Sequence, residues 1–163
     1  MKNLIIYDSY FENTEKIAKA VHNAFPQDKG CDIHKVSDWN GDLPDDLEIL
    51  IVGSPTRQFS STKAIQDFLK GIPSKRLEKV NVASFDTRIK LDTIKSSALR
   101  FMVDKGGYAA KTIARKLKNK GGKLLAPPEG FLVTGEQGPL LEGEIERAKS
   151  WAKALLVNET PSD

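Results

Sequence analysis

Several residue types are scarce in this 163-residue chain, and each scarcity excludes a class of protein. Cysteine occurs once, at Cys31, which excludes an internal disulfide and a zinc site built from several cysteines. Two histidines, His22 and His34, leave little material for metal binding through imidazole. No apolar run approaches the roughly 18 residues of a membrane-spanning helix, and no basic segment precedes the first apolar run. We therefore expect a cytoplasmic protein with no signal peptide, no membrane span and no metal.

Acidic residues are scarce in one part of the chain, although the net charge is only +3. Residues 88–123 contain eleven Lys and Arg against Asp92 and Asp104, which is +9 locally and leaves −6 for the remainder. One interpretation is a solvated helix face. The other is a surface on which an acidic partner or a phosphate-bearing ligand docks. Basic residues do not alternate with aromatic ones, so we expect no nucleic-acid partner.

Strand-like and helix-like segments alternate along the chain. The strand-like runs are residues 4–8, 31–36, 48–53, 80–85 and 123–126, and residues 131–133 resume the last one after Pro127 and Pro128. The helix-like segments are residues 13–25, 62–69, 110–117 and 139–155, with Pro139 opening the last helix and Leu141 on its apolar face. This alternation predicts an α/β fold, a parallel sheet with helices on both faces. We assign residues 1–157 to one domain and residues 158–163 to a frayed tail.

The loops that follow three of the predicted strands are the candidate positions for a binding site. Ligands of open parallel sheets bind at the carboxyl ends of the strands. Those ends lead into residues 8–14, 53–61 and 85–91.

The first loop has the composition of an anion site. Ser9, Asn13 and Thr14 supply hydrogen-bond donors just before a helix, where free backbone N–H groups and the helix dipole attract phosphate. The alternative is that Asn13 or Thr14 caps its own helix. The loop contains neither a P-loop nor a dinucleotide-binding glycine pattern. The third strand ends without an aspartate, which argues against a phosphate-accepting receiver domain.

Three segments resemble the flavin loops of the flavodoxin family. Residues 7–18 (YDSYFENTEKIA) resemble its phosphate loop, residues 52–56 (VGSPT) its second loop, and residues 83–88 (ASFDTR) occupy the place of the third. The resemblance implies a flavodoxin-like three-layer sandwich with a five-stranded sheet in the order 2-1-3-4-5, and noncovalent FMN. It places these residues at the cofactor: Ser9, Tyr10, Phe11, Glu12, Asn13, Thr14, Ser54, Pro55, Thr56, Arg57, Phe59, Phe85, Asp86, Thr87 and Arg88.

The chain departs from the family pattern in two ways. Glu12 stands where the family usually has glycine, and its carboxylate predicts weaker FMN binding unless it points to solvent. The usual ring-flanking aromatics are absent, so Phe59 is the candidate stacking residue, with a core position as its alternative, and Tyr108 is a weaker candidate. Arg57 and Arg88 would stabilise the negative charge of reduced flavin, unless they face solvent or pair with Asp86.

These observations favour an FMN-binding electron carrier of the flavodoxin family. A flavin-dependent reductase passing a hydride from a nicotinamide to a quinone-type acceptor is one alternative. A flavin-free flavodoxin-like module that binds a partner through its basic half is the other. No Ser, His and Asp are placed for nucleophilic catalysis, so no catalytic residue is assigned.

Overall fold

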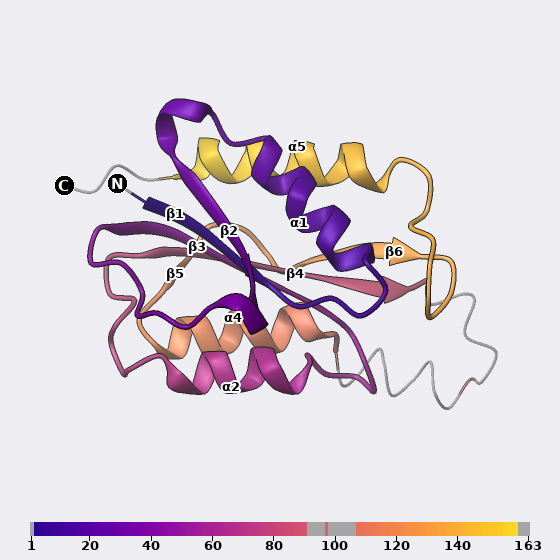
Figure 1. Cartoon of the computed structure of the whole chain (residues 1–163), viewed down its shortest axis with the longest axis horizontal. Helices are drawn as coiled ribbons and strands as arrows, with labels where there is room; N and C mark the ends of the chain where they lie inside the picture. The colour runs from indigo at the N-terminus through magenta and orange to yellow at the C-terminus, as the bar shows by residue number, and fades with distance from the viewer. Residues whose placement is uncertain (1, 91–96, 98–106, 160–163) are drawn as a thin grey trace.

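The computed structural model describes residues 2–90, 97 and 107–159, and its elements alternate as the sequence predicts (Figure 1). The strands are β1 (Lys2–Tyr7), β2 (Cys31–Lys35), β3 (Leu47–Pro55), β4 (Asn81–Ile89), β5 (Lys123–Leu124) and β6 (Glu129–Val133). The helices are α1 (Asn13–Asn23), α2 (Lys63–Gly71), α4 (Ala109–Asn119) and α5 (Glu144–Asn158), with short 3-10 turns η1 (Gln27–Lys29) and η2 (Val36–Asp38).

The sheet has the predicted order. Neighbouring strands pair in parallel along the path β2-β1-β3-β4-β5, and β6 pairs with β4 as well. The predicted flavodoxin-like fold class is confirmed.

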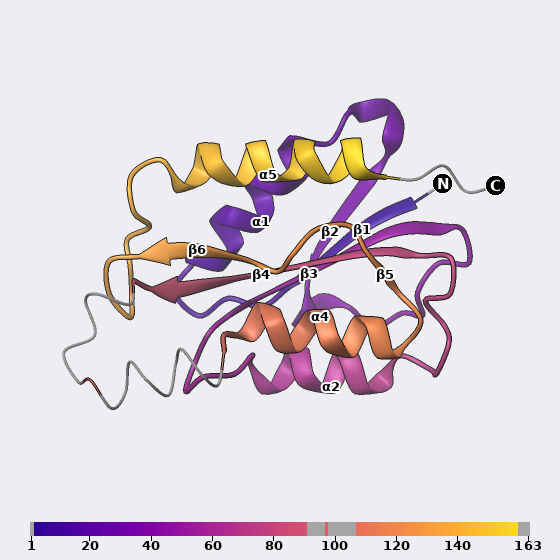
Figure 2. The same cartoon turned by 180° about the vertical axis from the view of Figure 1, so that it is seen from behind.

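Helices cover both faces of the sheet. Helices α1 and α5 lie on one face, and α2 and α4 lie on the other (Figures 1 and 2). Alternate side chains of β1 enter different cores: Ile5 and Tyr7 join the cluster that includes α1 and α5, whereas Leu4 and Ile6 join the one that includes α2 and α4. A strand buried on both faces needs a continuous apolar run, which is why β1 is recognisable in the sequence.

The fifth strand is split, and the split places a further loop beside the site. Pro127 and Pro128 lie between its halves, since proline has no N–H to donate to a neighbouring strand. Strand β5 pairs with the start of β4, and β6 pairs with its end, from Phe85 to Ile89. Val133 and the residues after it therefore reach the carboxyl edge of the sheet.

The last helix begins later than the sequence predicts. Helix α5 starts at Glu144, not at Pro139, so the expected place of Leu141 on its apolar face is wrong. The N–H of Thr134 donates to the Pro139 carbonyl, and that of Leu141 donates to the Leu132 carbonyl. These bonds to the end of β6 take the chain through a loop before the helix begins.

The carboxyl-terminal residues that the structure describes are anchored. Asn158 is the last residue of α5, and its Nδ2 donates to the Leu125 carbonyl at 3.3 Å. Glu159 pairs with Lys29 at 2.6 Å. The first two residues of the segment expected to fray are thus held in place, and the rest of it lies outside the described residues.

No helix within the described residues is both long enough and apolar enough to cross a membrane. Lys95, Arg100 and Lys105 of the basic stretch lie outside the described residues, as do Asp92 and Asp104.

Candidate functional site

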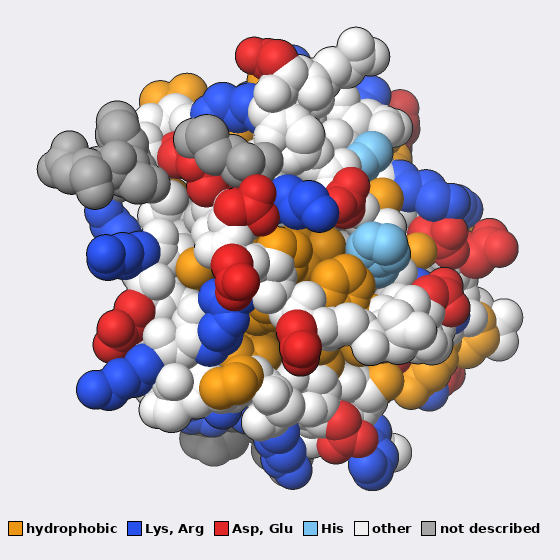
Figure 3. Space-filling model, turned by 60° about the vertical axis from the view of Figure 1, so that its left-hand side comes forward, with side chains coloured by type: hydrophobic (Ala, Val, Ile, Leu, Met, Phe, Trp, Pro, Cys, Tyr) orange, Lys and Arg blue, Asp and Glu red, His pale blue; other side chains and the backbone are white. Residues whose placement is uncertain are grey.

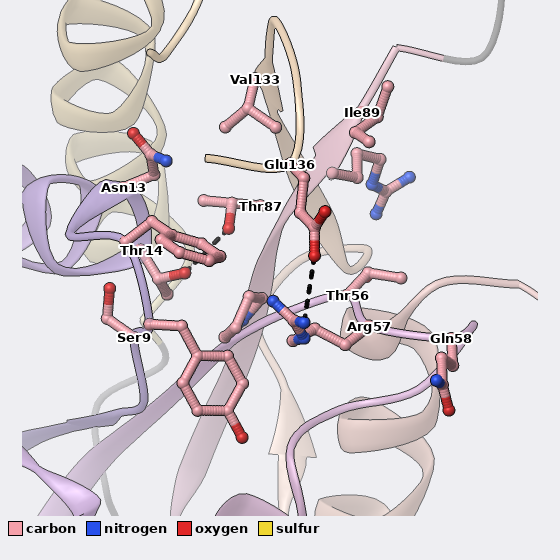
Figure 4. A pocket seen from close by; sticks show the side chains of 14 residues that line it. Ser9, Asn13, Thr14, Thr56, Arg57, Gln58, Thr87, Ile89, Val133 and Glu136 are labelled. Carbon is pink, nitrogen blue, oxygen red and sulfur yellow. Dashed lines mark hydrogen bonds and ion pairs between the residues drawn. The ribbon is translucent and has the colours of Figure 1, made fainter. Parts of the chain in front are cut away.

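A cavity of about 310 Å³ lies at the carboxyl edge of the sheet, where the three predicted loops meet (Figure 4). Its lining comes from the loop after β1 and the start of α1, from the ends of β3 and β4, from the loop after β3, and from the end of β6 with the loop that follows it. The lining residues are Ser9, Tyr10, Phe11, Asn13, Thr14, Pro55, Thr56, Arg57, Gln58, Thr87, Arg88, Ile89, Val133 and Glu136.

The start of α1 leaves backbone donors beside this cavity. Glu12 is the N-cap residue and makes no side-chain capping bond, while the side chain of Asn13 donates to the Gln137 carbonyl at 3.1 Å. The expectation that Asn13 or Thr14 caps its own helix is therefore wrong. Among the described residues, the N–H groups of Asn13 and Thr14 have no protein acceptor. Free N–H groups at the positive end of a helix dipole form an anion site.

Two hydroxyls join the first and third loops. Thr14 Oγ1 and Thr87 Oγ1 lie 2.8 Å apart, and both residues are buried. Ser9 Oγ accepts the N–H of Glu15 at 3.4 Å, which leaves its own hydrogen for another acceptor. These hydroxyls and the free N–H groups form the polar end of the cavity.

The backbone conformation of Glu12 is one that glycine adopts more easily than any other residue, which is consistent with the glycine expected at this position from the family pattern. Its φ is 65°, in the left-handed region where residues with a Cβ are strained. The side chain is exposed and does not line the cavity.

The second loop contributes its middle residues. Pro55, Thr56 and Arg57 line the cavity, but Ser54 is fully buried and is not part of the lining. Its Oγ accepts the N–H of Thr62 and donates to the Pro55 carbonyl. Phe59 is half-buried and is not part of the lining. The ring expected to stack on a flat ligand is thus not at the cavity.

The third loop is divided between core and cavity. Phe85 is fully buried, with its ring 6.1 Å from that of Phe131 and 6.0 Å from that of Trp151, so it packs in the core. Thr87 and Arg88 line the cavity, whereas Asp86 does not.

Asp86 positions Arg88. Its carboxylate accepts Arg88 Nε at 2.7 Å and Nη2 at 2.8 Å, and it also accepts the N–H of Ala110 at 2.9 Å. Burial raises the pKa of Asp86, and the bonds from Arg88 oppose that shift. The Arg88 guanidinium stacks 3.6 Å from the centre of the Tyr108 ring. Tyr108, the weaker candidate for stacking on the cofactor, thus packs against Arg88 and is absent from the cavity lining.

Arg57 has exposed partners. It pairs with Glu136 at 3.2 Å, and its guanidinium lies 4.9 Å from the ring centre of Tyr10 and 5.7 Å from that of Phe11. Tyr10 and Phe11 are the aromatic residues of the cavity lining, and they are 55% and 38% exposed.

Sequence reasoning missed four lining residues: Gln58, Ile89, Val133 and Glu136. Gln58 and Ile89 lay inside the loops selected for the search. The other two had a usable signal, because residues 131–133 were predicted to resume the fifth strand. Because ligands bind at the carboxyl ends of parallel strands, the end of this strand and the residues after it were also candidates for the site.

A second cavity, of about 510 Å³, is lined by residues of the segment before β3 and of the end of α2. Trp39, Leu43, Phe68 and Ile72 contribute apolar lining, and Arg76 Nη2 donates to the Leu43 and Pro44 carbonyls. Figure 3 turns the left-hand side of Figure 1 forward and shows hydrophobic side chains at the centre of that face, among Asp, Glu and His side chains. None of the predicted site residues lines the second cavity.

Comparisons with known proteins agree with this geometry. Residues 5–151 match the family model described as Flavodoxin, and no curated protein matches the chain. Flavodoxin 1 from Bacillus cereus is 15% identical, with a TM-score of 0.74 over 96% of this chain and 98% of that chain. A flavodoxin from the domain Archaea is 17% identical, with a TM-score of 0.68 over 98% of this chain and 100% of that chain.

The fold also occurs as part of a larger protein. Rubredoxin oxygen:oxidoreductase from Desulfovibrio gigas is 20% identical, with a TM-score of 0.69 over 98% of this chain but 37% of that chain. At such identities these structures establish the shared fold, while the match to the family model covers most of the sequence. The chain belongs to the flavodoxin family, whose cofactor is FMN.

Proposed function

We propose that this protein is an electron carrier that holds FMN noncovalently in the 310 Å³ cavity. The observation that carries the proposal is the pair of N–H groups of Asn13 and Thr14, which lack protein acceptors among the described residues and lie at the polar end of that cavity. We assign the phosphate to residues 9–14. We assign the ring to the space between Tyr10, Phe11 and Arg57 on one side and Thr87 to Ile89 on the other.

The residues present fit this cofactor. The volume is at the lower end of the roughly 300–1,000 Å³ range of small-molecule sites. The hydroxyls of Ser9, Thr14 and Thr87 stand beside the free N–H groups, where a phosphate needs donors. Glu12, the one acidic residue of the loop after Ser9, is exposed and outside the lining.

These contacts indicate which roles belong to the cofactor and which to the protein. Bound FMN supplies the one- and two-electron redox chemistry at its ring. Residues 9–14 would bind the phosphate and the walls would orient the ring. The hydrogen bond between the buried hydroxyls of Thr14 and Thr87 holds the first and third loops together at the polar end of the cavity.

The size and rim of the cavity favour a carrier over a reductase with its own nicotinamide site. A volume near the lower limit leaves little room for a second large substrate. Tyr10, Phe11 and Ile89 expose apolar surface at the cavity, where a partner protein can approach the flavin. We also propose a cytoplasmic location, in keeping with the single cysteine.

The basic half supplies a proposed docking surface for acidic redox partners. Lys111, Arg115 and Lys118 are exposed on α4, where they line a hollow of about 240 Å³. Arg88 does not belong to this surface, because its guanidinium is engaged by Asp86.

A flavin titration tests the proposal. Purified apoprotein should bind FMN, and the Ser9→Ala/Thr14→Ala variant should bind it more weakly by about 1–3 kcal/mol, the cost of lost hydrogen bonds to a charged group. Thr112→Ala, which removes the hydroxyl of a half-buried threonine on α4, is the matched control.

The possible outcomes separate the alternatives. Wild-type protein that binds no FMN would favour the flavin-free partner module. Equal affinity in the double variant would remove the phosphate assignment. Rapid flavin reduction by NADPH or NADH alone, followed by transfer to a quinone, would favour the reductase.

A further inference from the structure

Two side chains from opposite sides of the FMN cavity meet across it. Arg57 comes from the loop after β3, and Glu136 comes from the loop after β6 (Figure 4). Arg57 Nη2 lies 3.2 Å from Glu136 Oε1, and both residues line the cavity. This ion pair therefore connects the loop after β3 to the loop after β6 across the cavity.

Arg57 is held on its other side by aromatic rings. Its guanidinium lies within 6 Å of the ring centres of Tyr10 and Phe11, at 4.9 and 5.7 Å, which is the geometry of a cation–π contact. Both rings come from the loop after β1. Arg57 thus connects this loop to the loop that carries Glu136.

The backbones that carry Arg57 and Glu136 are fixed. Arg57 and Ser60 exchange two backbone hydrogen bonds, of 2.8 and 2.9 Å. On the other side, the Gln137 carbonyl accepts Asn13 Nδ2 at 3.1 Å, and the N–H of Gly138 donates to the Gly135 carbonyl at 3.0 Å. The connection can therefore open by rotation of side chains, without rearrangement of either loop.

The ion pair itself is exposed and easily broken. The side chain of Arg57 is 38% exposed and that of Glu136 is 70% exposed. Exposed pairs are weak and are screened by salt. Such a pair suits a contact that opens and closes often.

We propose that Arg57 and Glu136 form a clasp across the cavity that has to open for FMN to enter and to leave. Glu136 is the positioning residue, because it holds Arg57 across the cavity. This inference rests on the proposed FMN site and adds a control of the rate of cofactor exchange.

A clasp has a kinetic signature that a simple contact lacks. If exchange requires the open arrangement, loss of the pair raises the association rate and the dissociation rate together. If Glu136 or Arg57 only stabilises bound FMN, dissociation alone accelerates. For an exposed pair the expected rise in each rate is about two- to fivefold.

The experiment compares Glu136→Gln, Glu136→Asp and Glu142→Gln with wild type. Glu142 is an exposed acid of the same loop that does not line the cavity, so its substitution makes the same change of charge away from Arg57. Association is followed by quenching of FMN fluorescence on mixing with apoprotein, and dissociation by displacement of radiolabelled FMN with excess unlabelled FMN.

The inference predicts that both rates rise in Glu136→Gln, remain at the wild-type level in Glu142→Gln and return toward it in Glu136→Asp. High salt should bring the dissociation rates of wild type and Glu136→Gln together, because it weakens a pair that only wild type retains.

Two results would overturn the clasp while FMN binding stands: rates in Glu136→Gln equal to those in Glu142→Gln, or a faster dissociation with unchanged association. Wild-type protein that binds no FMN would overturn the proposed function and the clasp with it.

Discussion

The two arginines at the cavity are held in opposite ways. Arg88 makes a bidentate pair with Asp86, and the two side chains are 20% and 0% exposed. Arg57 makes a single contact with Glu136, and those side chains are 38% and 70% exposed. Arg88 thus belongs to a largely buried ion pair on one wall of the cavity, whereas Arg57 belongs to an exposed ion pair on the other. Substitutions on the first wall should change stability, whereas those on the second should change exchange and redox properties.

The largest expected effect follows from breaking the interior pair. Arg88→Gln should lower the free energy of unfolding by about 3 kcal/mol at pH 7, because it leaves a buried carboxylate without its cation. Arg57→Gln, the matched change on the exposed wall, should cost less than about 1 kcal/mol. Denaturant unfolding of both variants measures the difference, and equal losses would contradict the comparison.

The loss in Arg88→Gln should also depend on pH. Burial raises the pKa of Asp86, and removal of Arg88 takes away the strongest of the interactions that oppose this shift. A carboxyl with a higher pKa in the folded state contributes stability at low pH, and this contribution is lost as the pH rises through the folded-state pKa. The loss should therefore be larger at pH 7 than at pH 5. A loss independent of pH would mean that Asp86 does not titrate in this range.

A smaller effect, and an increase in stability rather than a loss, is expected from a substitution of the exposed residue Glu12. Glu12→Gly should raise the free energy of unfolding by about 0.5–1 kcal/mol, because glycine adopts the φ of 65° without a Cβ clash. Glu15→Gly, in the first turn of α1, is the matched control and should lower stability by about 1 kcal/mol.

The Glu12→Gly variant also tests the charge at this position. Tighter FMN binding with weaker salt dependence would mean that the Glu12 carboxylate acts on the phosphate. Unchanged binding is the outcome expected for an exposed side chain outside the cavity lining.

The smallest expected effect concerns the reduction potential of the bound flavin. We expect Arg57 to stabilise negative charge on the reduced ring, with Glu136 and solvent reducing this stabilisation to about 0.5 kcal/mol, or about 20 mV for one electron. Arg57→Gln should lower the potential by that amount in a spectroelectrochemical titration, and Arg115→Gln, on the exposed part of α4, should leave it unchanged. Identical potentials in all three proteins would mean that Arg57 does not act on the ring.

The fold and the location of the cavity at the carboxyl edge were predictable because both depend on local patterns. Buried parallel strands require continuous apolar runs, as in β1 and β3, and the loops after such strands meet at one edge of the sheet. The start of α5 was not predictable in this way. Proline at position 139 is compatible with a first helical turn, but hydrogen bonds to the end of β6 decide the conformation there.

The sequence by itself determined the order of elements, the three loops at the carboxyl edge and the types of side chain they present. Only the tertiary structure decided the partner of each side chain. Thr14 and Thr87 are 73 positions apart, and Arg57 and Glu136 are 79 apart. Asp86 and Arg88 are near neighbours, yet burial under α4 makes their pair an interior one. Contacts between distant segments depend on strand register and loop conformation, which residue spacing does not encode.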